Sequence, residues 1–212
     1  MSVVEKQNAH WKRIYRAGDP REASWYEPIP TASLELIEAT GVAQDGPVID
    51  VGGGTSTLVD CLLAKGFTDL TVLDIAPAAL DKARRRLGES AGRVTWLSAD
   101  VTKFRPARAY ALWHDRAVFH FLTDAKSRRS YLETLRGALA RPGHVILATF
   151  GPEGPARCSG LDVMRYSVAE LSACLGPEFR LMLERTVEHT TPEGHRQQFV
   201  YGWWRRSDLS GS

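Results

Sequence analysis

A short apolar segment followed at once by three glycines constrains the fold of this chain more than any other part of it. The segment covers residues 48–51, and Gly52, Gly53 and Gly54 come directly after it. The apolar spacing of residues 57–65 then fits a helix packed against a sheet. A strand, a glycine turn and a helix in this order bring backbone N–H groups to one point, where they can face a ligand. We therefore expect an α/β domain with a ligand site at this turn.

The residues around the turn separate two classes of ligand. A dinucleotide site needs Gly-x-Gly-x-x-Gly, whose last glycine lets helix and strand pack closely, but Thr57 occupies that sixth position. Asp50 lies two residues before the first glycine, where a carboxylate repels a pyrophosphate and attracts an ammonium group. S-adenosylmethionine (SAM) carries an ammonium and a sulfonium group and no phosphate. The turn therefore favours SAM, and an NAD(P)-dependent oxidoreductase is the first alternative.

The same stretch resembles motif I of the class I SAM-dependent methyltransferases, written Asp/Glu-x-Gly-x-Gly-x-Gly. Asp50, Gly52 and Gly54 match this motif, and Ser56 stands where its last glycine would be. Serine is small and can help to cap the helix that follows. The resemblance implies a Rossmann-like enzyme of the small bacterial type that uses SAM.

Composition and charge are those of an ordinary globular domain. The 212 residues are 43% hydrophobic and 25% charged, which suits one α/β domain with a substantial core. A net charge of +2 gives no reason to expect a nucleic-acid partner. Residues 1–8 lack the apolar stretch of a signal peptide, and no apolar run approaches the ~18 residues of a membrane span. We therefore expect a cytoplasmic protein without a membrane partner.

The three cysteines are odd in number and widely spaced along the chain. Neither a disulfide framework nor a zinc pattern can be read from them. The acids also do not assemble into the divalent-metal cluster of a catechol-type methyltransferase, so no metal is expected.

Strands and helices alternate regularly after the glycine turn. Further strands are expected at residues 70–74, 94–98, 109–113 and 144–150, with helices at 78–87 and from about 123 to 140. Such alternation predicts a doubly wound, mostly parallel sheet. Near the C-terminus, a capped helix opening at Ser167 precedes two strands, at 179–189 and 197–204, that form an antiparallel hairpin.

These elements predict a single methyltransferase domain over residues 1–212. Residues 1–33 are expected to form an N-terminal helical arm or lid, and 47–150 the SAM-binding core. Residues 151–212 are expected to supply a substrate-side loop, a helix and the C-terminal hairpin. The whole resembles the seven-stranded methyltransferase sheet, in which one strand near the edge runs backwards.

Acids close three successive strands of the predicted sheet: Asp50, Asp74 and Asp100. Ligands of open α/β sheets bind beyond the carboxyl ends of the strands. The methyltransferase resemblance implies that Asp74 binds the ribose, that Ile75 lies against adenine, and that Asp100 and the amide of Val101 bind the adenine edge. The alternatives are a helix cap for Asp74 and a turn residue for Asp100.

His114, Asp115 and Arg116 follow the fourth strand, where the resemblance places the methionine half of SAM and the transferring methyl. Methyl transfer is an in-line displacement, so the protein has to align the nucleophile, exclude water and remove any proton that the nucleophile carries. His114 and Asp115 are candidate bases and candidate SAM contacts, and Arg116 is a candidate acceptor contact. Alternatively, Asp115 pairs with Arg116 or holds only the SAM amino group.

Two further segments are expected to border the site. Trp25 and Tyr26 lie in a Pro-rich part of the arm, and their rings either attract a sulfonium by cation–π contact or staple the arm to the core. Cys158 and Tyr166 follow the fifth strand and are candidate acceptor contacts.

The acceptor is less constrained than the cofactor. No Pro-Pro pair occurs in the chain, so the Asn/Asp-Pro-Pro-aromatic motif of DNA amino-methyltransferases is absent. A small-molecule acceptor is favoured. A protein lysine methyltransferase is the alternative, because residues 115–120 faintly resemble the Asp-Lys-Gly-Thr stretch of eukaryotic-type lysine methyltransferases. A SAM-binding module without enzymatic activity stays open.

Overall fold

The computed structural model describes residues 9–15 and 19–207. Its strands are β1 (Val48–Val51), β2 (Leu70–Asp74), β3 (Val94–Ser98), β4 (Tyr110–Arg116), β5 (Leu139–Phe150), β6 (Arg157–Cys158), β7 (Leu161–Asp162), β8 (Phe179–Thr190) and β9 (Arg196–Arg206). Its α-helices are α2 (Thr31–Thr40), α3 (Leu58–Ala64), α4 (Pro77–Leu87), α5 (Ala125–Ala138) and α6 (Val168–Leu175). Residues 9–15 are also helical, and short 3₁₀ turns cover η1 (Pro20–Glu22), η2 (Gly88–Arg93) and η3 (Phe119–Phe121).

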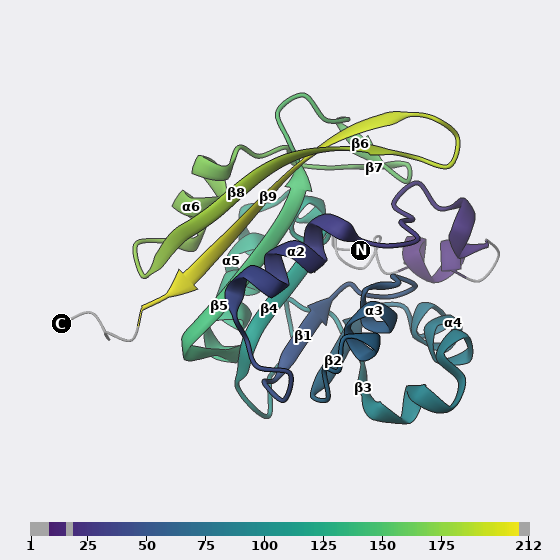
Figure 1. Cartoon of the computed structure of the whole chain (residues 1–212). Helices are drawn as coiled ribbons and strands as arrows, with labels where there is room; N and C mark the ends of the chain where they lie inside the picture. The colour runs from purple at the N-terminus through teal and green to yellow at the C-terminus, as the bar shows by residue number, and fades with distance from the viewer. Residues whose placement is uncertain (1–8, 16–18, 208–212) are drawn as a thin grey trace.

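Seven strands form one sheet in the order β3-β2-β1-β4-β5-β9-β8 (Figure 1). Strands β1 to β5 run parallel, whereas β9 is antiparallel to β5 and β8 is antiparallel to β9. The strand order reverses between β1 and β4, which is where open α/β sheets bind their ligands. The expected doubly wound sheet with its C-terminal antiparallel hairpin is confirmed.

Helices cover both faces of this sheet. One apolar core contains Leu36 of α2, Leu62 of α3 and Leu80 of α4. The other contains Leu135 of α5 and Leu171 of α6. Two separate cores, one on each face, are what a doubly wound sheet requires, because its central parallel strands are then buried on both sides.

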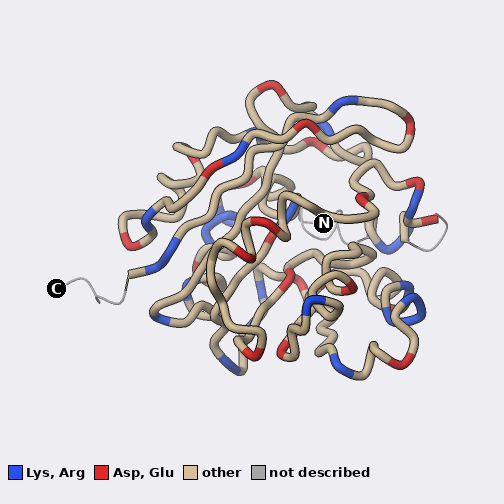
Figure 2. Tube along the Cα trace, in the orientation of Figure 1, with Lys and Arg blue, Asp and Glu red and all other residues tan. Residues whose placement is uncertain are grey.

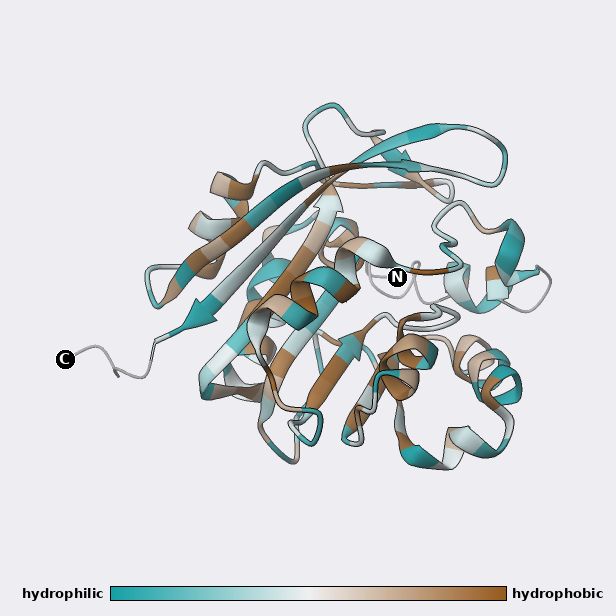
Figure 3. Cartoon of the chain, in the orientation of Figure 1, coloured by the Kyte–Doolittle hydropathy of each residue, from teal (hydrophilic) through white to brown (hydrophobic). Residues whose placement is uncertain are grey.

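The short strand β1 illustrates this double burial. Val48 belongs to the first core and its neighbour Ile49 to the second, since successive side chains point to opposite faces. Figure 3 shows β1 as one of the strongly apolar segments of the chain. Because both faces of β1 are buried, its sequence is mostly apolar and shows no alternation of polar and apolar residues.

Helix α2 was not expected from the sequence. It begins directly after Pro30, without a side-chain cap, and ends at Gly41, whose φ of 69° is left-handed. Thr31, Ser33 and Thr40 are weak helix formers, so the local signal is small. Leu36 is nevertheless fully buried, which means that the core begins well before residue 47. Residues 1–8 and 16–18 of the predicted arm lie outside the described residues.

Two strands extend beyond their predicted limits. Strand β4 continues through Arg116 instead of ending at residue 113, and β5 begins at Leu139, directly after α5. The predicted capping box of α6 is present, with Ser167 and Glu170 bonding each other's backbone N–H groups. The extension of β4 matters for the site, because it makes three predicted site residues part of a strand.

Charged side chains of both signs are interspersed along the described part of the chain (Figure 2). In that same part, no helix is long and apolar enough to cross a membrane.

Candidate functional site

The glycine turn lies against the two acids that end β1 and β2. A Cβ added to Gly53 would meet Asp50 Oδ2 at 2.4 Å, and one added to Gly54 would meet Asp74 Oδ2 at 2.6 Å. Only glycine lets the backbone approach both carboxylates this closely. Ser56, at the motif's last position, accepts a hydrogen bond at 3.1 Å from the backbone N–H of Leu58, the first residue of α3, although Thr57 is the N-cap residue of that helix.

A cleft with about 850 Å³ of empty space opens beside this turn. Its lining contains the residues predicted for the adenosyl group, namely Asp74, Ile75, Asp100 and Val101. It also contains Trp11, Tyr15, Trp25, Phe121 and Cys158, which we call the aromatic end of the cleft. The structure thus brings the predicted adenosyl residues together and adds an aromatic end, of which the sequence analysis named only Trp25 and Cys158.

A second cavity of about 530 Å³ adjoins the cleft and shares Tyr15, Trp25, Gly52 and Arg116 with it. Its other lining residues include Asp50, His114, Ser33, Tyr26 and Glu27. The predicted cofactor residues therefore divide into two groups, one around each cavity, and the glycine turn lies between them.

Asp74 is a buried carboxyl group facing the cleft. Its side chain is 5% exposed, and Oδ1 accepts a hydrogen bond from the backbone N–H of Ala76 at 2.8 Å. Burial raises its pKa to about 7 against the lowering effect of the hydrogen bond from Ala76, and the nearby charge of Asp50 adds a smaller increase. Helix α4 begins at Pro77 with Ala76 as its N-cap residue, so Asp74 is not the helix cap.

Asp100 is placed both to act as a turn residue and to contact adenine, the two roles that the sequence left open. Its Oδ1 accepts hydrogen bonds from the backbone N–H and the hydroxyl of Thr102, at 2.9 and 2.7 Å, as a turn residue does. Its Oδ2 is buried, and among the described residues it has no hydrogen-bond partner, with Lys103 Nζ 3.8 Å away. A free acceptor of this kind in the cleft suits an exocyclic amine.

Asp50, His114 and Ser33 form a buried chain of hydrogen bonds. His114 lies opposite Asp50 in the β1–β4 register, and its Nδ1 donates to Asp50 Oδ1 at 2.7 Å, since a carboxylate only accepts. Its Nε2 lies 2.9 Å from the hydroxyl of Ser33 on α2. Both ring nitrogens are thus engaged with the protein. Ser33 was missed because α2 was missed.

Asp115 points away from both cavities. Its carboxylate accepts hydrogen bonds from the backbone N–H groups of Val118 and Phe119, at 2.8 and 3.1 Å, and from the hydroxyl of Tyr131 at 2.5 Å. It is fully buried, and burial raises its pKa to about 6 although the Tyr131 hydrogen bond opposes this. Asp115 does not pair with Arg116. It holds the turn after β4, in which Ala117 has a φ of 70°.

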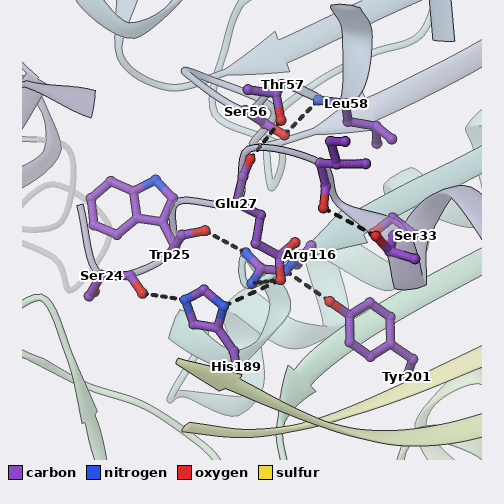
Figure 4. Close-up of polar contacts among 12 residues, drawn as sticks. Ser24, Trp25, Glu27, Ser33, Ser56, Thr57, Leu58, Arg116, His189 and Tyr201 are labelled. Carbon is purple, nitrogen blue, oxygen red and sulfur yellow. Dashed lines mark hydrogen bonds and ion pairs between the residues drawn. The ribbon is translucent and has the colours of Figure 1, made fainter. Parts of the chain in front are cut away.

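Arg116 connects β4 with the arm (Figure 4). Its three nitrogen atoms donate to the hydroxyl of Tyr201 at 2.9 Å, the carbonyl of Trp25 at 3.0 Å and the carboxylate of Glu27 at 3.1 Å. Its guanidinium carbon lies 4.6 Å from the centre of the Phe199 ring. Each nitrogen therefore has a protein acceptor already.

The other residues predicted to contact cofactor or acceptor differ in whether they line one of the two cavities. Cys158 lines the cleft, and burial raises the pKa of its thiol, which keeps it protonated. Tyr26 lines the second cavity. Tyr166 lines neither: it packs on Phe119 with the ring centres 5.4 Å apart, and its buried hydroxyl finds no hydrogen-bond partner among the residues described.

The aromatic end of the cleft comes from segments far apart in the sequence. Trp11 and Tyr15 lie four residues apart on one helical face and stack at 5.9 Å. The ring of Trp11 also meets Trp25 at 5.6 Å and Phe121 at 5.1 Å, both edge to face. The four-residue spacing of Trp11 and Tyr15 was the one sequence signal that pointed to this cluster. Within residues 9–15 and 19–207, no three His, Cys, Asp or Glu side chains are placed to hold a metal ion.

Comparison with known proteins identifies the core of the chain. Residues 48–143 match a family model described as a methyltransferase domain. A malonyl-[acyl-carrier protein] O-methyltransferase of Anoxybacillus flavithermus is 29% identical over 153 residues, 71% of this chain and 57% of that protein. Nodulation protein S of Sinorhizobium fredii is 33% identical over 116 residues, 53% of this chain and 51% of that protein. The chain therefore spans little more than half the length of these curated relatives.

A solved structure shares the fold over nearly the whole chain. It is the 1,6-didemethyltoxoflavin-N1-methyltransferase of Burkholderia thailandensis, with 1,6-didemethyltoxoflavin and S-adenosylhomocysteine (SAH) bound. The TM-score is 0.71 at 19% identity, covering 97% of this chain and 88% of that one. Together with the glycine turn, the strand order and the acids at the sheet edge, these matches identify residues 48–143 as a methyltransferase domain of the SAM-dependent, Rossmann-like type.

Proposed function

We propose that this protein transfers a methyl group from SAM to a small-molecule acceptor. The observation that carries the proposal is the continuity of the two cavities around the glycine turn. They join three acids at the sheet edge, Asp50, Asp74 and Asp100, to an aromatic surface from the arm. The three carboxylates suit the ammonium group, the ribose hydroxyls and the adenine amine of SAM, and the aromatic rings suit its sulfonium group.

Each part of the cofactor has a fitting group in the chain. Asp50 offers a negative charge to the ammonium group, and buried Asp74 offers oxygens to the ribose hydroxyls. Asp100 Oδ2, which has no hydrogen-bond partner in the described chain, suits the adenine amine beside Ile75 and Val101. The bound cofactor supplies the methyl group as an electrophile on sulfur.

The arm and η3 supply the surface next to the expected sulfonium. Trp25 and Tyr15 line both cavities, and an aromatic face attracts a sulfonium by about 0.5–2 kcal/mol. The same rings exclude water, which strengthens electrostatic contacts inside the cleft. We propose that alignment and water exclusion are the main contributions of the chain to the reaction.

Two features support a cofactor-side role for His114 and a structural role for Asp115. His114 has both nitrogens bonded within the protein, and Asp115 holds the turn after β4 from behind the cleft. We propose that His114 orients Asp50 and that Arg116 orients the arm. Cys158 also lines the cleft, and its thiol interacts with Ser24 of the arm.

The names of the relatives support a small-molecule acceptor over a protein lysine. They are a malonyl-[acyl-carrier protein] O-methyltransferase and nodulation protein S, and the solved structure contains 1,6-didemethyltoxoflavin. The match to a methyltransferase domain leaves no support for the oxidoreductase alternative.

Incubation with methyl-labelled SAM and a cell extract, separated by size into metabolites and proteins, tests the proposed acceptor class. We expect label in the metabolite fraction, and none when Asp50 is replaced by alanine. Label confined to protein bands would reverse the acceptor assignment. Label in neither fraction, from a protein that binds SAH, would favour a binding module.

A further inference from the structure

The arm is held on the sheet by a buried cluster that includes a histidine from the C-terminal hairpin (Figure 4). His189 on β8 contacts the carbonyl of Ser24 through Nε2 at 2.7 Å and the carboxylate of Glu27 through Nδ1 at 3.3 Å. Arg116 contacts the same Glu27 oxygen from the side of β4. We call Glu27, Arg116 and His189 the arm latch.

The chemistry of the arm latch fixes the hydrogens on His189. Burial raises the pKa of Glu27, but the hydrogen bond from His189 and the charge of Arg116 outweigh it and hold that pKa below its ordinary value. Glu27 is therefore a carboxylate, which only accepts, as does the Ser24 carbonyl. Both nitrogens of His189 face acceptors on the arm, so the ring acts toward the arm as a hydrogen-bond donor.

Within the described part of the chain, the charged groups that contact His189 directly or through Glu27 come from two elements. The groups facing it are Glu27 from the arm and, across that carboxylate, Arg116 from β4. On β9, Phe199 meets the imidazole edge to face at 6.1 Å, and Tyr201 accepts from Arg116. Side-chain exposure is 5% for His189, 12% for Arg116 and 20% for Glu27, so solvent screens this cluster weakly.

The arm latch is connected directly to the cofactor site. Trp25, Tyr26 and Glu27 line the second cavity, so the arm segment has to move for that cavity to open. The backbone carbonyl of Glu27 also accepts a hydrogen bond from the hydroxyl of Thr57 at 2.8 Å. Thr57 occupies the position at which a dinucleotide turn has its last glycine, and here its side chain fastens the arm.

We propose that His189 is a positioning residue, which acts through Glu27 to hold the arm over the cofactor site and so limits cofactor exchange. This inference rests on the proposed function. Opening the arm separates Glu27 from His189 and Arg116, leaving buried charges without their partners, and this opposes opening. The C-terminal hairpin thus takes part in a site that is otherwise built from the first half of the chain.

The rate of SAH release from the His189→Gln variant tests the proposal. Trp11 and Trp25 lie beside the cleft, so tryptophan fluorescence in a stopped-flow displacement with excess SAM reports release. Loss of a charged hydrogen bond to Glu27 is expected to speed release by about 10- to 100-fold. The matched control is His195→Gln on the exposed hairpin turn, whose side chain is 76% exposed, and which is expected to release SAH at the wild-type rate.

Glu27→Gln separates positioning from a merely structural role. Its amide oxygen can take the place of Oε1 and accept hydrogen bonds from both Arg116 and His189. We therefore expect Glu27→Gln to release SAH more slowly than His189→Gln does. Release by His189→Gln at the wild-type rate, or release by Glu27→Gln as fast as that of His189→Gln, would overturn the proposal.

Amide hydrogen exchange of the protein without any ligand reports how firmly the arm is held. It therefore tests the arm latch independently of the proposed function. Exchange at residues 24–27 is expected to be faster in His189→Gln than in wild type or His195→Gln. If wild type fails to bind SAH, the proposed function fails, and this comparison still decides whether the arm latch holds the arm. Equal exchange in all three proteins would contradict it.

Discussion

The Asp74→Asn variant is expected to bind SAH about 10- to 100-fold more weakly than wild type, because a charge-assisted pair of hydrogen bonds to the ribose is weakened. In the proposed complex, Asp74 is the ribose acid, and its carboxylate is nearly free of solvent. Asparagine keeps the size of the side chain but loses the charge and one acceptor. Isothermal titration calorimetry with SAH measures the difference directly.

The same substitution is expected to change how stability depends on pH. The folded pKa of Asp74, about 7, lies above the ordinary value of 3.8 for this side chain, so the folded state holds a proton that the unfolded state has lost. Stability therefore falls as pH rises from about 4 to about 7 and is flat above that range. At 1.36 kcal/mol per pKa unit, this residue contributes a loss of about 4 kcal/mol.

Urea denaturation of wild type and Asp74→Asn across this pH range measures that effect. Between pH ~4 and pH ~8, wild type is expected to lose about 4 kcal/mol of unfolding free energy relative to the variant. SAH affinity of wild type is expected to fall below about pH 7, by up to tenfold per pH unit, and the variant lacks this dependence. Asp81→Asn, on the exposed side of α4, is the control. A pH-independent difference in stability would contradict the account of Asp74.

The Gly52→Ala variant is expected to lose SAH binding and to be destabilised by about 2–5 kcal/mol, from left-handed strain plus overpacking. Gly52 has a φ of 71°, and its added Cβ would lie 2.0 Å from Val118 Cγ2. Val118 cannot retreat easily, because its backbone N–H is bonded to buried Asp115. Either the turn or the floor of the cleft has to shift.

Two companion variants make this prediction specific. Gly137→Ala lies inside α5, where an added Cβ meets no atom within 4 Å, and it is expected to stabilise the protein by up to ~1 kcal/mol. Adding Val118→Ala to Gly52→Ala removes the clash but not the strain, so partial recovery is expected. Urea unfolding measures the stability of each variant, and SAH calorimetry measures its affinity for the cofactor product. Wild-type SAH affinity in Gly52→Ala would show that the turn does not contact the cofactor.

Short sequence patterns were enough to predict the strands and the acids that lie along the carboxyl edge of the sheet. β1, the glycine turn and α3 are contiguous, so apolar spacing and glycine chemistry suffice to place them. Once the strands are parallel, acids at their carboxyl ends have to lie along one edge, which brings Asp50, Asp74 and Asp100 together. These predictions needed no knowledge of long-range packing.

The roles of the residues after β4 depended on where that strand ends. Because β4 continues through Arg116, side chains alternate between the two faces of the sheet. His114 and Arg116 point to the side of α2 and the arm, and Asp115 points to the side of α5. A strand ending at residue 113 would not impose this alternation, so Asp115 was grouped with its neighbours.

The arm latch and Ser33 were beyond prediction for a different reason. His189 meets Ser24 across 165 positions of sequence, and Ser33 meets His114 across 81. Such contacts arise from the packing of whole elements, and the residues themselves are ordinary polar side chains on an edge strand and a weakly encoded helix. Nothing in the residues next to His189 in the sequence indicates that its side chain is buried, and yet it is 6% exposed.

Calorimetric titration of the wild-type protein with SAH, and in parallel with NADH, tests the central claim most directly. The three acids and the glycine turn predict saturable one-site binding of SAH and no measurable binding of NADH, whose pyrophosphate would face Asp50. Binding of NADH with none of SAH would contradict the account.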